Sequence, residues 1–231
     1  PSPCPSPSPS PSPSPSPSPN QVALLPVFGS GESSDGQSKA NRAEAEAVAA
    51  VVQRLLASGD LRAADVGIIT PYAAQVRVLR SLLRGVGGGG GDAGVEVSSV
   101  DGFQGREKEV IVFSAVRASA GGSLGFLTDA RRANVSITRA RRGLIVVGHP
   151  PTLCRDPGTW GRWVAWARAH GLVMGESQSG QYDVEATRDA SAELMSAVDV
   201  VPGGAPHAAL SAAMGDMQQQ PHQQQQQQQQ Q

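Results

Sequence analysis

The sequence contains very little cysteine. Cys4 and Cys154 are the two cysteines of a chain of 231 residues, and they stand far apart. Two isolated cysteines provide neither the framework of a disulfide-stabilised secreted domain nor the ligand spacing of a zinc site. We therefore expect no disulfide framework and no metal site built from this chain's own side chains.

Long hydrophobic runs and an excess of one charge are missing as well. No run of about 18 apolar residues occurs, and there is no positively charged, apolar secretory signal. The 19 basic and 20 acidic side chains leave a formal net charge of -1, which argues against a protein that coats a polyanion. We expect a protein outside the membrane and inside the cell, in the nucleus or the cytoplasm.

A phosphate-binding loop is also missing. That loop needs Gly-x-x-x-x-Gly-Lys-Ser/Thr between a strand and a helix. Residues 87–91 are five consecutive glycines, but Asp92 and Ala93 follow them instead of a lysine. We interpret the run as a flexible loop insertion. No Asp-Glu pair that could hold Mg²⁺ follows an apolar strand either.

Both ends of the chain have low-complexity composition. Residues 1–19 alternate proline and serine apart from Cys4, and the chain is nearly all glutamine from Met217 onward. Such segments have little apolar surface to bury. We expect disordered tails at 1–20 and 177–231 around one domain at 21–176. The first residue is proline rather than methionine, so we expect a fragment or a processed chain.

Between the tails, short β-branched runs alternate with helical patterns, which is typical of a parallel α/β sheet covered by helices on both faces. A helix should begin at Asn41, with Glu44 completing a capping box, and a second should follow Pro71. A third, at 159–169, carries three tryptophans, either as a base-stacking platform or, as we favour, as an aromatic packing face. The expected strands are residues 22–28, 66–70, 95–100, 110–116 and 144–147.

Basic residues are concentrated in one part of this near-neutral chain. Eight Arg or Lys stand against four Asp or Glu between Asp101 and Gly143, and five of the arginines fall between Arg131 and Arg142. A local basic stripe suggests a directed phosphate contact. The alternative is a solvated charged face.

Three segments place polar residues next to the expected strands. In open α/β sheets the ligand crevice lies at the carboxyl ends of the strands, so we expect the site there. The segments are Ile-Ile-Thr-Pro-Tyr-Ala-Ala-Gln at 68–75, Val-Ser-Ser-Val-Asp-Gly-Phe-Gln-Gly-Arg-Glu-Lys-Glu at 97–109 and Arg-Arg-Ala-Asn-Val-Ser-Ile-Thr-Arg-Ala-Arg-Arg-Gly at 131–143.

The segment at 131–143 is predicted to form a helix. Ala133, Ile137 and Ala140 would share one buried face, and Arg139 would stand at the edge of that face. A guanidinium held in this way can neutralise charge on a transferring γ-phosphoryl group. Arginine suits the task because its planar fork donates to two phosphate oxygens and stays charged.

The segment at 97–109 is predicted to turn close to a ligand. Ser99 and the backbone near Asp101 could bond sugar or phosphate without reading bases. Gly102 and Gly105 permit a tight turn and a close approach of the backbone. The alternative is a charged surface loop between two strands.

In this order, the three segments resemble motifs IV, V and VI of superfamily 1 helicases of the Up-frameshift and senataxin type. The likeness runs from about Lys39 to Gly148 and weakens toward Glu176. It implies the second RecA-like domain of an ATP-dependent, 5′→3′ RNA or DNA translocase. The partners would be single-stranded RNA or DNA and a first RecA-like domain absent from this chain, which would hold most of the ATP and Mg²⁺.

The resemblance also implies roles for individual residues at the nucleotide. Arg139 would be the arginine finger, and Glu107 would share the catalytic site with it. Gly105 and Glu107 would contact phosphates and ribose, Tyr72 would stack near the base, and Gln75 would line the cleft. Together these five residues form the expected ATP-binding set.

A second implied set contacts nucleic acid, and it consists of Ser99, Val100, Asp101 and Thr138. Without the phosphate-binding half, this chain alone should neither hydrolyse ATP well nor unwind a duplex. An alternative hypothesis is a non-catalytic module that binds single strands or a protein partner. A third is a secreted wall protein whose Pro-Ser repeat is the functional part, against which the missing secretory signal argues.

Overall fold

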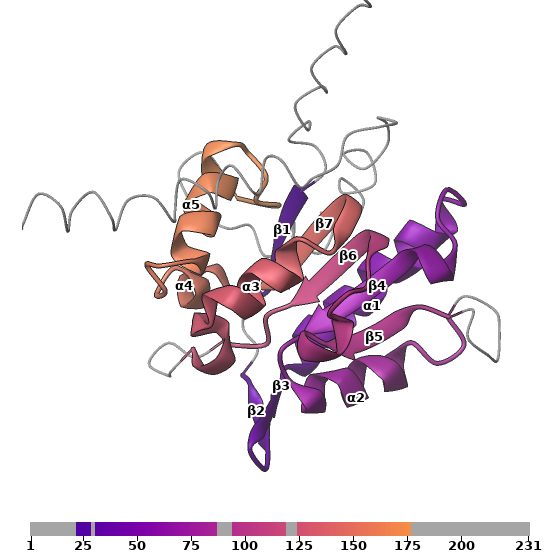
Figure 1. Cartoon of the computed structure of the whole chain (residues 1–231), viewed down its shortest axis with the longest axis horizontal. Coiled ribbons are helices and arrows are strands. Elements are labelled where there is room, and N and C mark those ends of the chain that lie inside the picture. The colour runs from indigo at the N-terminus through magenta and orange to yellow at the C-terminus, as the bar shows by residue number, and fades with distance from the viewer. Residues whose placement is uncertain (1–21, 29–30, 87–93, 119–123, 177–231) are drawn as a thin grey trace, which may run out of the picture.

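The described part of the chain forms one α/β unit (Figure 1). The two predicted disordered tails and the glycine run lie outside the described residues. Within the described part, no helix combines the length and the apolar character needed to cross a bilayer. The computed structural model describes residues 22–28, 31–86, 94–118 and 124–176.

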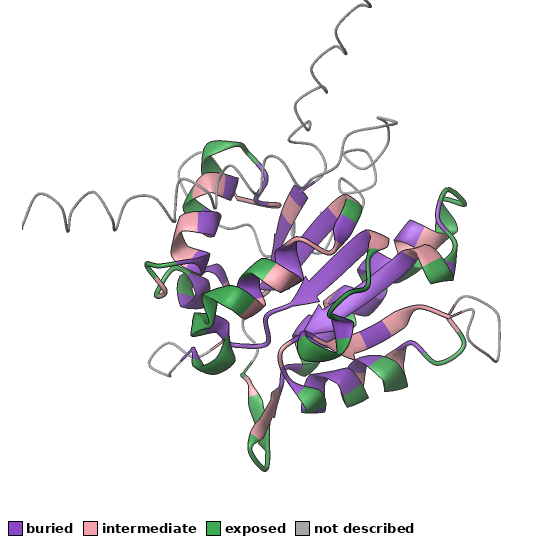
Figure 2. Cartoon of the chain, in the orientation of Figure 1, coloured by how far each residue is buried: buried purple, intermediate pink, exposed green. Residues whose placement is uncertain are grey.

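A five-stranded parallel sheet forms the centre of the unit, as predicted, with strand order β1-β7-β6-β4-β5. Most of the strands are rich in apolar residues, the short edge strand β5 being the exception, and the middle strands are buried along most of their length (Figure 2). The order of the strands in the sheet differs from their order along the chain. The connections between these parallel strands are crossovers, most of which contain a helix. The strands are β1 (Val22–Pro26), β4 (Val66–Thr70), β5 (Glu96–Ser99), β6 (Lys108–Ser114) and β7 (Ala140–Gly148).

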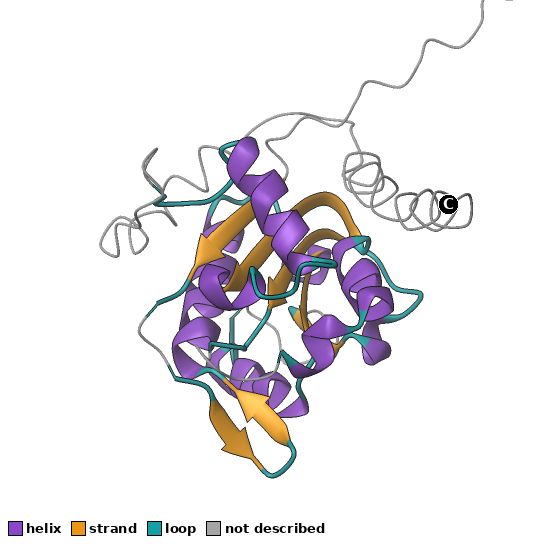
Figure 3. Ribbon diagram, turned by 90° about the vertical axis from the view of Figure 1, so that its left-hand side faces the viewer, coloured by secondary structure: helices purple, strands orange, loops and turns teal. Residues whose placement is uncertain are grey.

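Helices cover both faces of this sheet, which confirms the predicted RecA-like layering (Figure 3). Helices α1 (Arg42–Ala57) and α2 (Ala73–Leu82) pack on one face. On the other face lie α3 (Ala130–Ile137), α4 (Pro150–Leu153) and α5 (Trp160–Ala169). Successive strand side chains alternate between the two resulting cores, as the pleat of a strand requires.

Several short elements were not predicted. The antiparallel hairpin of β2 (Ser33–Asp35) and β3 (Ser38–Ala40) projects from the body next to α2 (Figure 1). Its strands are short and polar, so the hydrophobic pattern carries no signal for them. Three 3₁₀ turns complete the fold, and they are η2 (Ala63–Asp65), η3 (Asp101–Phe103) and η4 (Gly125–Thr128).

The cap of α1 is confirmed, but the predicted capping box is wrong. The Asn41 side chain accepts a hydrogen bond from the Glu44 N–H at 3.1 Å. The Glu44 carboxylate does not return to the cap, because it accepts from Ser114 Oγ and Val116 N, both at 2.7 Å. The Asn41 N–H instead donates to Gln75 Oε1. Tertiary partners on β6 and α2 therefore replace the local bond.

The predicted helix over 131–143 is also shorter than expected. Helix α3 ends at Ile137, and β7 begins at Ala140, four residues before the predicted strand. Ala140 is still buried, but as a strand residue that pairs with Lys108 of β6. Arg139 consequently lies in the turn between α3 and β7. Pairing with β6 outweighs the helical pattern here because it adds ladder bonds and burial together.

The three tryptophans of α5 form a packing face, as we favoured. Trp160 is fully buried and stacks on Phe113 with ring centroids 5.0 Å apart. Its Nε1–H donates to the Leu127 carbonyl at 2.9 Å. Trp163 is buried against it edge-on, and Trp166 is half-buried at the margin. The helix is thus docked on the sheet by its aromatic side.

Replacing Trp160 by phenylalanine should lower the free energy of unfolding by about 2 kcal/mol. The smaller ring leaves space beside Phe113, and the buried Leu127 carbonyl loses its donor. Urea denaturation of the full chain measures the change. Trp166→Phe is the matched control, with an expected loss below about 1 kcal/mol. Equal losses for the two variants would contradict the packing assignment.

Candidate functional site

The predicted site residues lie at two opposite ends of the sheet. Tyr72 and Gln75 follow the carboxyl end of β4, and Ser99 ends β5. Glu107 comes directly before β6, and Arg139 directly before β7, which places both at the amino ends of the strands. The expectation that all three segments meet at the carboxyl ends is therefore wrong. Between Asp101 and Lys108 the chain returns from the carboxyl end of β5 to the amino end of β6. The segment at 97–109 therefore has residues at both ends of the sheet.

At the amino end, the start of β6 lies beside the turn that precedes β7. The Lys108 N–H donates to the Arg139 carbonyl at 3.1 Å. Lys108 Nζ donates to the Ala64 carbonyl at 2.8 Å, just before β4. It also pairs with Glu96 Oε2 at 3.2 Å, at the start of β5. The register of the pairing shifts between Lys108 and Val110, as it does at a β-bulge. Bulges of this kind redirect side chains near functional sites.

Arg139 is half-buried in this turn. Its Nε donates to the Val135 carbonyl at 3.1 Å, and one Nη donates to Thr138 Oγ1 at 3.0 Å. Thr138 Oγ1 in turn donates to the Asn134 carbonyl at 2.8 Å. Within the described residues, no carboxylate forms an ion pair with Arg139. These contacts use two of the five guanidinium N–H donors and hold the group in place.

The neighbouring arginines are paired with carboxylates. Arg141 Nε lies 3.1 Å from Glu107 Oε2, and Arg142 bonds Asp60. Arg106 bonds Glu96 at the same edge. Arg139 differs from these neighbours because its bonds go to the neutral oxygens of Val135 and Thr138, and among the residues that the structure describes no carboxylate balances its positive charge.

Gly105 and Glu107 lie on the loop that leads into β6. Gly105 has φ +75°, a conformation that favours glycine, so the predicted tight turn is confirmed at this position. Glu107 is exposed and bonded to Arg141. The structure therefore brings Gly105, Glu107, Thr138 and Arg139 to one edge. Thr138 was assigned to nucleic acid, but it lies with the residues assigned to the nucleotide.

At the carboxyl end, the segment after β5 is held by its own polar groups. Ser99 Oγ accepts from the Gly102 N–H at 3.2 Å, and a Cβ on Gly102 would stand 2.5 Å from Ser98 Oγ. Val100 is buried and its carbonyl accepts from Phe103 N. In this turn Asp101 is exposed and Ser99 is half-buried.

Asp101 is joined to α3 by a bidentate ion pair. Arg132 Nε and Nη2 lie 3.1 and 3.0 Å from the two carboxylate oxygens. The same guanidinium lies over the ring of Phe126 in η4, with its carbon 5.0 Å from the ring centroid. Phe126 also meets Tyr72 edge-on at 5.7 Å. One aromatic ring therefore connects the segments after β4 and β5 with the start of α3.

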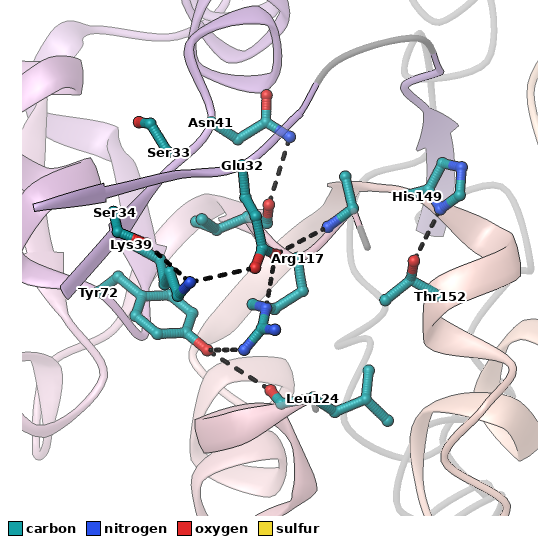
Figure 4. A network of polar contacts seen from close by, with 12 residues as sticks. Glu32, Ser33, Ser34, Lys39, Asn41, Tyr72, Arg117, Leu124, His149 and Thr152 are labelled. Atoms are coloured by element: carbon teal, nitrogen blue, oxygen red, sulfur yellow. Dashed lines mark hydrogen bonds and ion pairs between the residues drawn. The ribbon is translucent and has the colours of Figure 1, made fainter. Parts of the chain in front are cut away.

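Tyr72 is almost completely buried, at 3 % exposure. Its hydroxyl donates to the Leu124 carbonyl at 3.4 Å and accepts from an Arg117 Nη at 3.4 Å (Figure 4). Arg117 is itself buried and paired with Glu32 at 2.7 Å. Burial alone would raise the pKa of Glu32, but the bonds from Arg117, the Ala118 N–H and Lys39 together hold that pKa below its usual range.

Gln75 is buried, and both ends of its side-chain amide are bonded inside the fold. Its Oε1 accepts from Asn41 N at 2.9 Å, and its Nε2 donates to the Asn41 carbonyl at 3.1 Å and to Ser114 Oγ at 3.0 Å. The side chain thereby links α2, the start of α1 and the end of β6. A contact between Gln75 and a nucleotide stays a prediction.

Next to Gln75 lies a buried carboxyl, Glu44. Burial raises its pKa to about 8, although bonds from the Val116 N–H and Ser114 Oγ work in the opposite direction. Val116 has φ +71°, a strained conformation for a β-branched residue. Glu44 accepts from its N–H, and Asn41 Nδ2 donates to its carbonyl at 3.3 Å. These two bonds hold the backbone that delivers Arg117 to Tyr72.

The sequence did not indicate several residues of these networks, among them Glu32, Glu44 in its buried role, Arg117 and Phe126. Arg117 and Glu32 carry no local pattern, because their partners are far away in the chain. Phe126 offered one usable signal. It stands in a Gly-Phe-Leu-Thr-Asp run just before a basic helix, in a sequence with only 4 % aromatic residues.

Comparisons with known proteins agree with this architecture. The sequence model of the family described as "AAA domain" matches residues 9–151, more than half of the chain. A regulator of nonsense transcripts 1 homolog from Neurospora crassa is 43 % identical over 125 residues, covering 53 % of this chain and 11 % of the relative. DNA polymerase alpha-associated DNA helicase A from Schizosaccharomyces pombe is 42 % identical over 137 residues, covering 59 % and 20 %.

A further relative is the ATP-dependent helicase NAM7 from Saccharomyces cerevisiae. It is 38 % identical over 144 residues, covering 62 % of this chain and 15 % of the relative. The chain thus spans between a tenth and a fifth of the length of these curated relatives. The family match and the parallel, helix-covered sheet together show that the chain belongs to the AAA-domain family, among the superfamily 1 helicases of the Up-frameshift and NAM7 type.

Proposed function

We propose that this chain is the second RecA-like domain of an ATP-dependent helicase and that Arg139 acts on a nucleotide held by the first RecA-like domain. The observation that carries the proposal is the state of Arg139. Its guanidinium is fixed by two neutral oxygens at the amino edge, and no carboxylate among the described residues pairs with it.

The chemistry of that edge fits a phosphate group. A guanidinium whose charge is not balanced by a carboxylate can bind two phosphate oxygens in a planar fork. Because Arg139 is already held by Val135 and Thr138, little reorganisation is needed when negative charge develops on the γ-phosphoryl group. Such an arginine contributes roughly 10³–10⁵ in rate in related phosphoryl transfers.

Glu107 and Gly105 would complete this side of the nucleotide site. The exposed Glu107 carboxylate can accept hydrogen bonds from ribose hydroxyls, and the Gly105 backbone can come close because no Cβ stands in the way. Within the described residues, no group of three or more His, Cys, Asp or Glu could hold a metal. The family resemblance implies that Mg²⁺ would be held mainly by the first domain.

Tyr72 and Gln75 contribute differently in this proposal. Both lie at the opposite edge and are buried, so the nucleotide site proposed here rests on the amino-edge residues alone. The two side chains support the carboxyl-end surface, where Ser99 and Asp101 would meet the backbone of single-stranded RNA or DNA. Movement of the strand in the 5′→3′ direction is what the family resemblance implies.

Replacing Glu107 by glutamine should lower nucleotide affinity or ATP turnover about tenfold, since one charge-assisted hydrogen bond is weakened. The measurement is steady-state ATP hydrolysis by a protein that joins this chain to a first RecA-like domain. Glu109→Gln is the matched control, because Glu109 neighbours the same Arg141 at 3.8 Å but lies within β6. An unchanged rate for Glu107→Gln would remove this residue from the site.

A further inference from the structure

We propose that Phe126 is a stacking surface for a base of single-stranded nucleic acid. The inference rests on the nucleic-acid part of the proposed function and adds a contact that phosphate binding does not supply. Phosphate contacts position a strand, whereas an aromatic ring holds a base and is tolerant of its identity.

Phe126 is exposed where a phenylalanine normally would not be. The residue is 48 % exposed, and among the described residues it is the large hydrophobic residue that is exposed. Its neighbours in the same turn, Leu124 and Leu127, are buried. The turn η4 therefore directs two leucines into the core and the phenylalanine ring outward.

The ring is held firmly in this position. Arg132 lies over it at 5.0 Å, and the rings of Tyr72 and Phe126 form a T-shaped pair with centroids 5.7 Å apart. Arg132 is itself fixed by its bidentate pair with Asp101. The next residue, Leu127, is held as well, because its carbonyl accepts a hydrogen bond from the buried Trp160 Nε1–H. A ring that is already ordered loses little conformational entropy when a base stacks on it.

The surroundings favour a base over a protein partner. Arg131 and Arg132 lie within α3 just beyond the ring, and the polar groups of Ser99 and Asp101 lie on the neighbouring turn. A specific protein interface needs roughly 1,000 Å² of buried surface, far more than one half-exposed phenylalanine supplies. A single base needs an exposed aromatic ring close to a cation, and Phe126 with Arg132 provides both.

The test compares two labelled single strands of about 12 nucleotides, a length within the usual site size of single-strand binding domains. One is an oligouridylate, and the other has the same backbone but lacks the bases. Fluorescence anisotropy of the full chain is measured at about 50 mM salt, where phosphate contacts are strong. Phe126→Ala should weaken binding of the oligouridylate about 5- to 100-fold and leave the abasic strand unaffected.

Two further variants separate stacking from other causes. Phe126→Trp should retain or strengthen oligouridylate binding, whereas Phe126→Leu, which keeps apolar area without a π-face, should behave like the alanine variant. Arg42→Ala removes an exposed arginine of α1 on the other face of the sheet and should change neither affinity. Thermal melting of each variant checks that the fold is intact.

The possible results distinguish the two proposals. If the wild-type chain binds neither strand, the nucleic-acid part of the proposed function fails and the stacking inference fails with it. If it binds both strands but Phe126→Ala equals wild type, only the stacking inference is overturned. Equal weakening for both strands, or full binding by Phe126→Leu, would likewise show that the ring does not stack on a base.

Discussion

Replacing Arg139 by alanine should lower ATP turnover about 10³–10⁵-fold in a protein that joins this chain to a first RecA-like domain. The loss is expected because alanine cannot donate to the γ-phosphoryl group as its charge develops. Nucleic-acid binding should persist, since Ser99 and Asp101 lie at the opposite edge of the sheet. Steady-state ATP hydrolysis and anisotropy with a labelled single strand measure the two properties separately.

Two controls belong with this experiment. Arg142→Ala removes an arginine from the same edge whose guanidinium is bonded to Asp60, and it should leave turnover within a few-fold of wild type. Arg139→Lys keeps the charge but loses the planar fork, so it should recover only part of the rate. A parallel loss of ATP turnover and nucleic-acid binding in Arg139→Ala would show that the fold, rather than the chemistry, had been damaged.

The free energy of unfolding should fall as the pH rises from about 4.5 to about 8, because Glu44 keeps its proton in the folded protein. Its pKa is raised from 4.5 to about 8, chiefly by burial. In that window the unfolded chain releases a proton that the folded chain retains, so higher pH favours unfolding. The stabilising contribution is complete below about pH 4.5 and is lost progressively up to about pH 8.

The separation of about 3.5 between the two pKa values corresponds to a contribution of up to about 5 kcal/mol. This is a large fraction of the stability of a domain of this size. Denaturant unfolding of the full chain, repeated between about pH 5 and pH 8, measures the slope. Replacing Glu44 by glutamine should flatten it, because an amide does not titrate and its carbonyl can still accept from Ser114 and Val116.

Other titrating groups act differently in this experiment. Burial lowers the pKa of His149, so its contribution to stability is lost as pH falls and opposes that of Glu44. The pKa of Glu32 is lowered, so Glu32 affects the free energy of unfolding below this pH window. His149 and Glu32 are present in wild type and in Glu44→Gln alike. The difference between the pH profiles of these two proteins therefore reports on Glu44. Glu46→Gln, an exposed carboxylate of α1 paired with Arg42, is the matched control. A Glu44→Gln profile parallel to wild type would contradict the raised pKa.

The buried Glu44 side chain also supports the surface at the carboxyl ends of the strands. Glu44 and Asn41 hold Val116 in a conformation that costs about 1–3 kcal/mol for a residue other than glycine. The following residue, Arg117, bonds Tyr72 and Glu32. Tyr72 meets Phe126, and the beginning of α1 thereby supports the ring that we propose for base stacking.

Much of the fold could be predicted from the sequence because its signals are local. The continuous apolar runs of β4 and β6 indicate strands buried on both faces, and the tryptophan repeat of α5 indicates an aromatic packing face. Asn41 marks the beginning of α1 through a cap that depends only on nearby residues. These features follow from side-chain periodicity and from hydrogen bonds within one turn.

The boundary between α3 and β7 could not be predicted in the same way. Ala133, Ile137 and Ala140 have helical spacing, yet the last of them joins β7 because β6 is there to pair with it. Glu44 has the position of a capping-box residue, yet its carboxylate is drawn to Ser114 and Val116. In both cases a distant partner supplies more bonds and burial than the local alternative.

The amino-acid sequence by itself determined the α/β class, the three polar segments and the helicase resemblance, because these depend on residue type and spacing along the chain. Only the tertiary structure decided that Glu107 and Arg139 share the amino edge, while Tyr72, Asp101 and Phe126 gather at the carboxyl end. Parallel strands bring residues together according to their register, and register is set by packing between segments that are far apart in the chain.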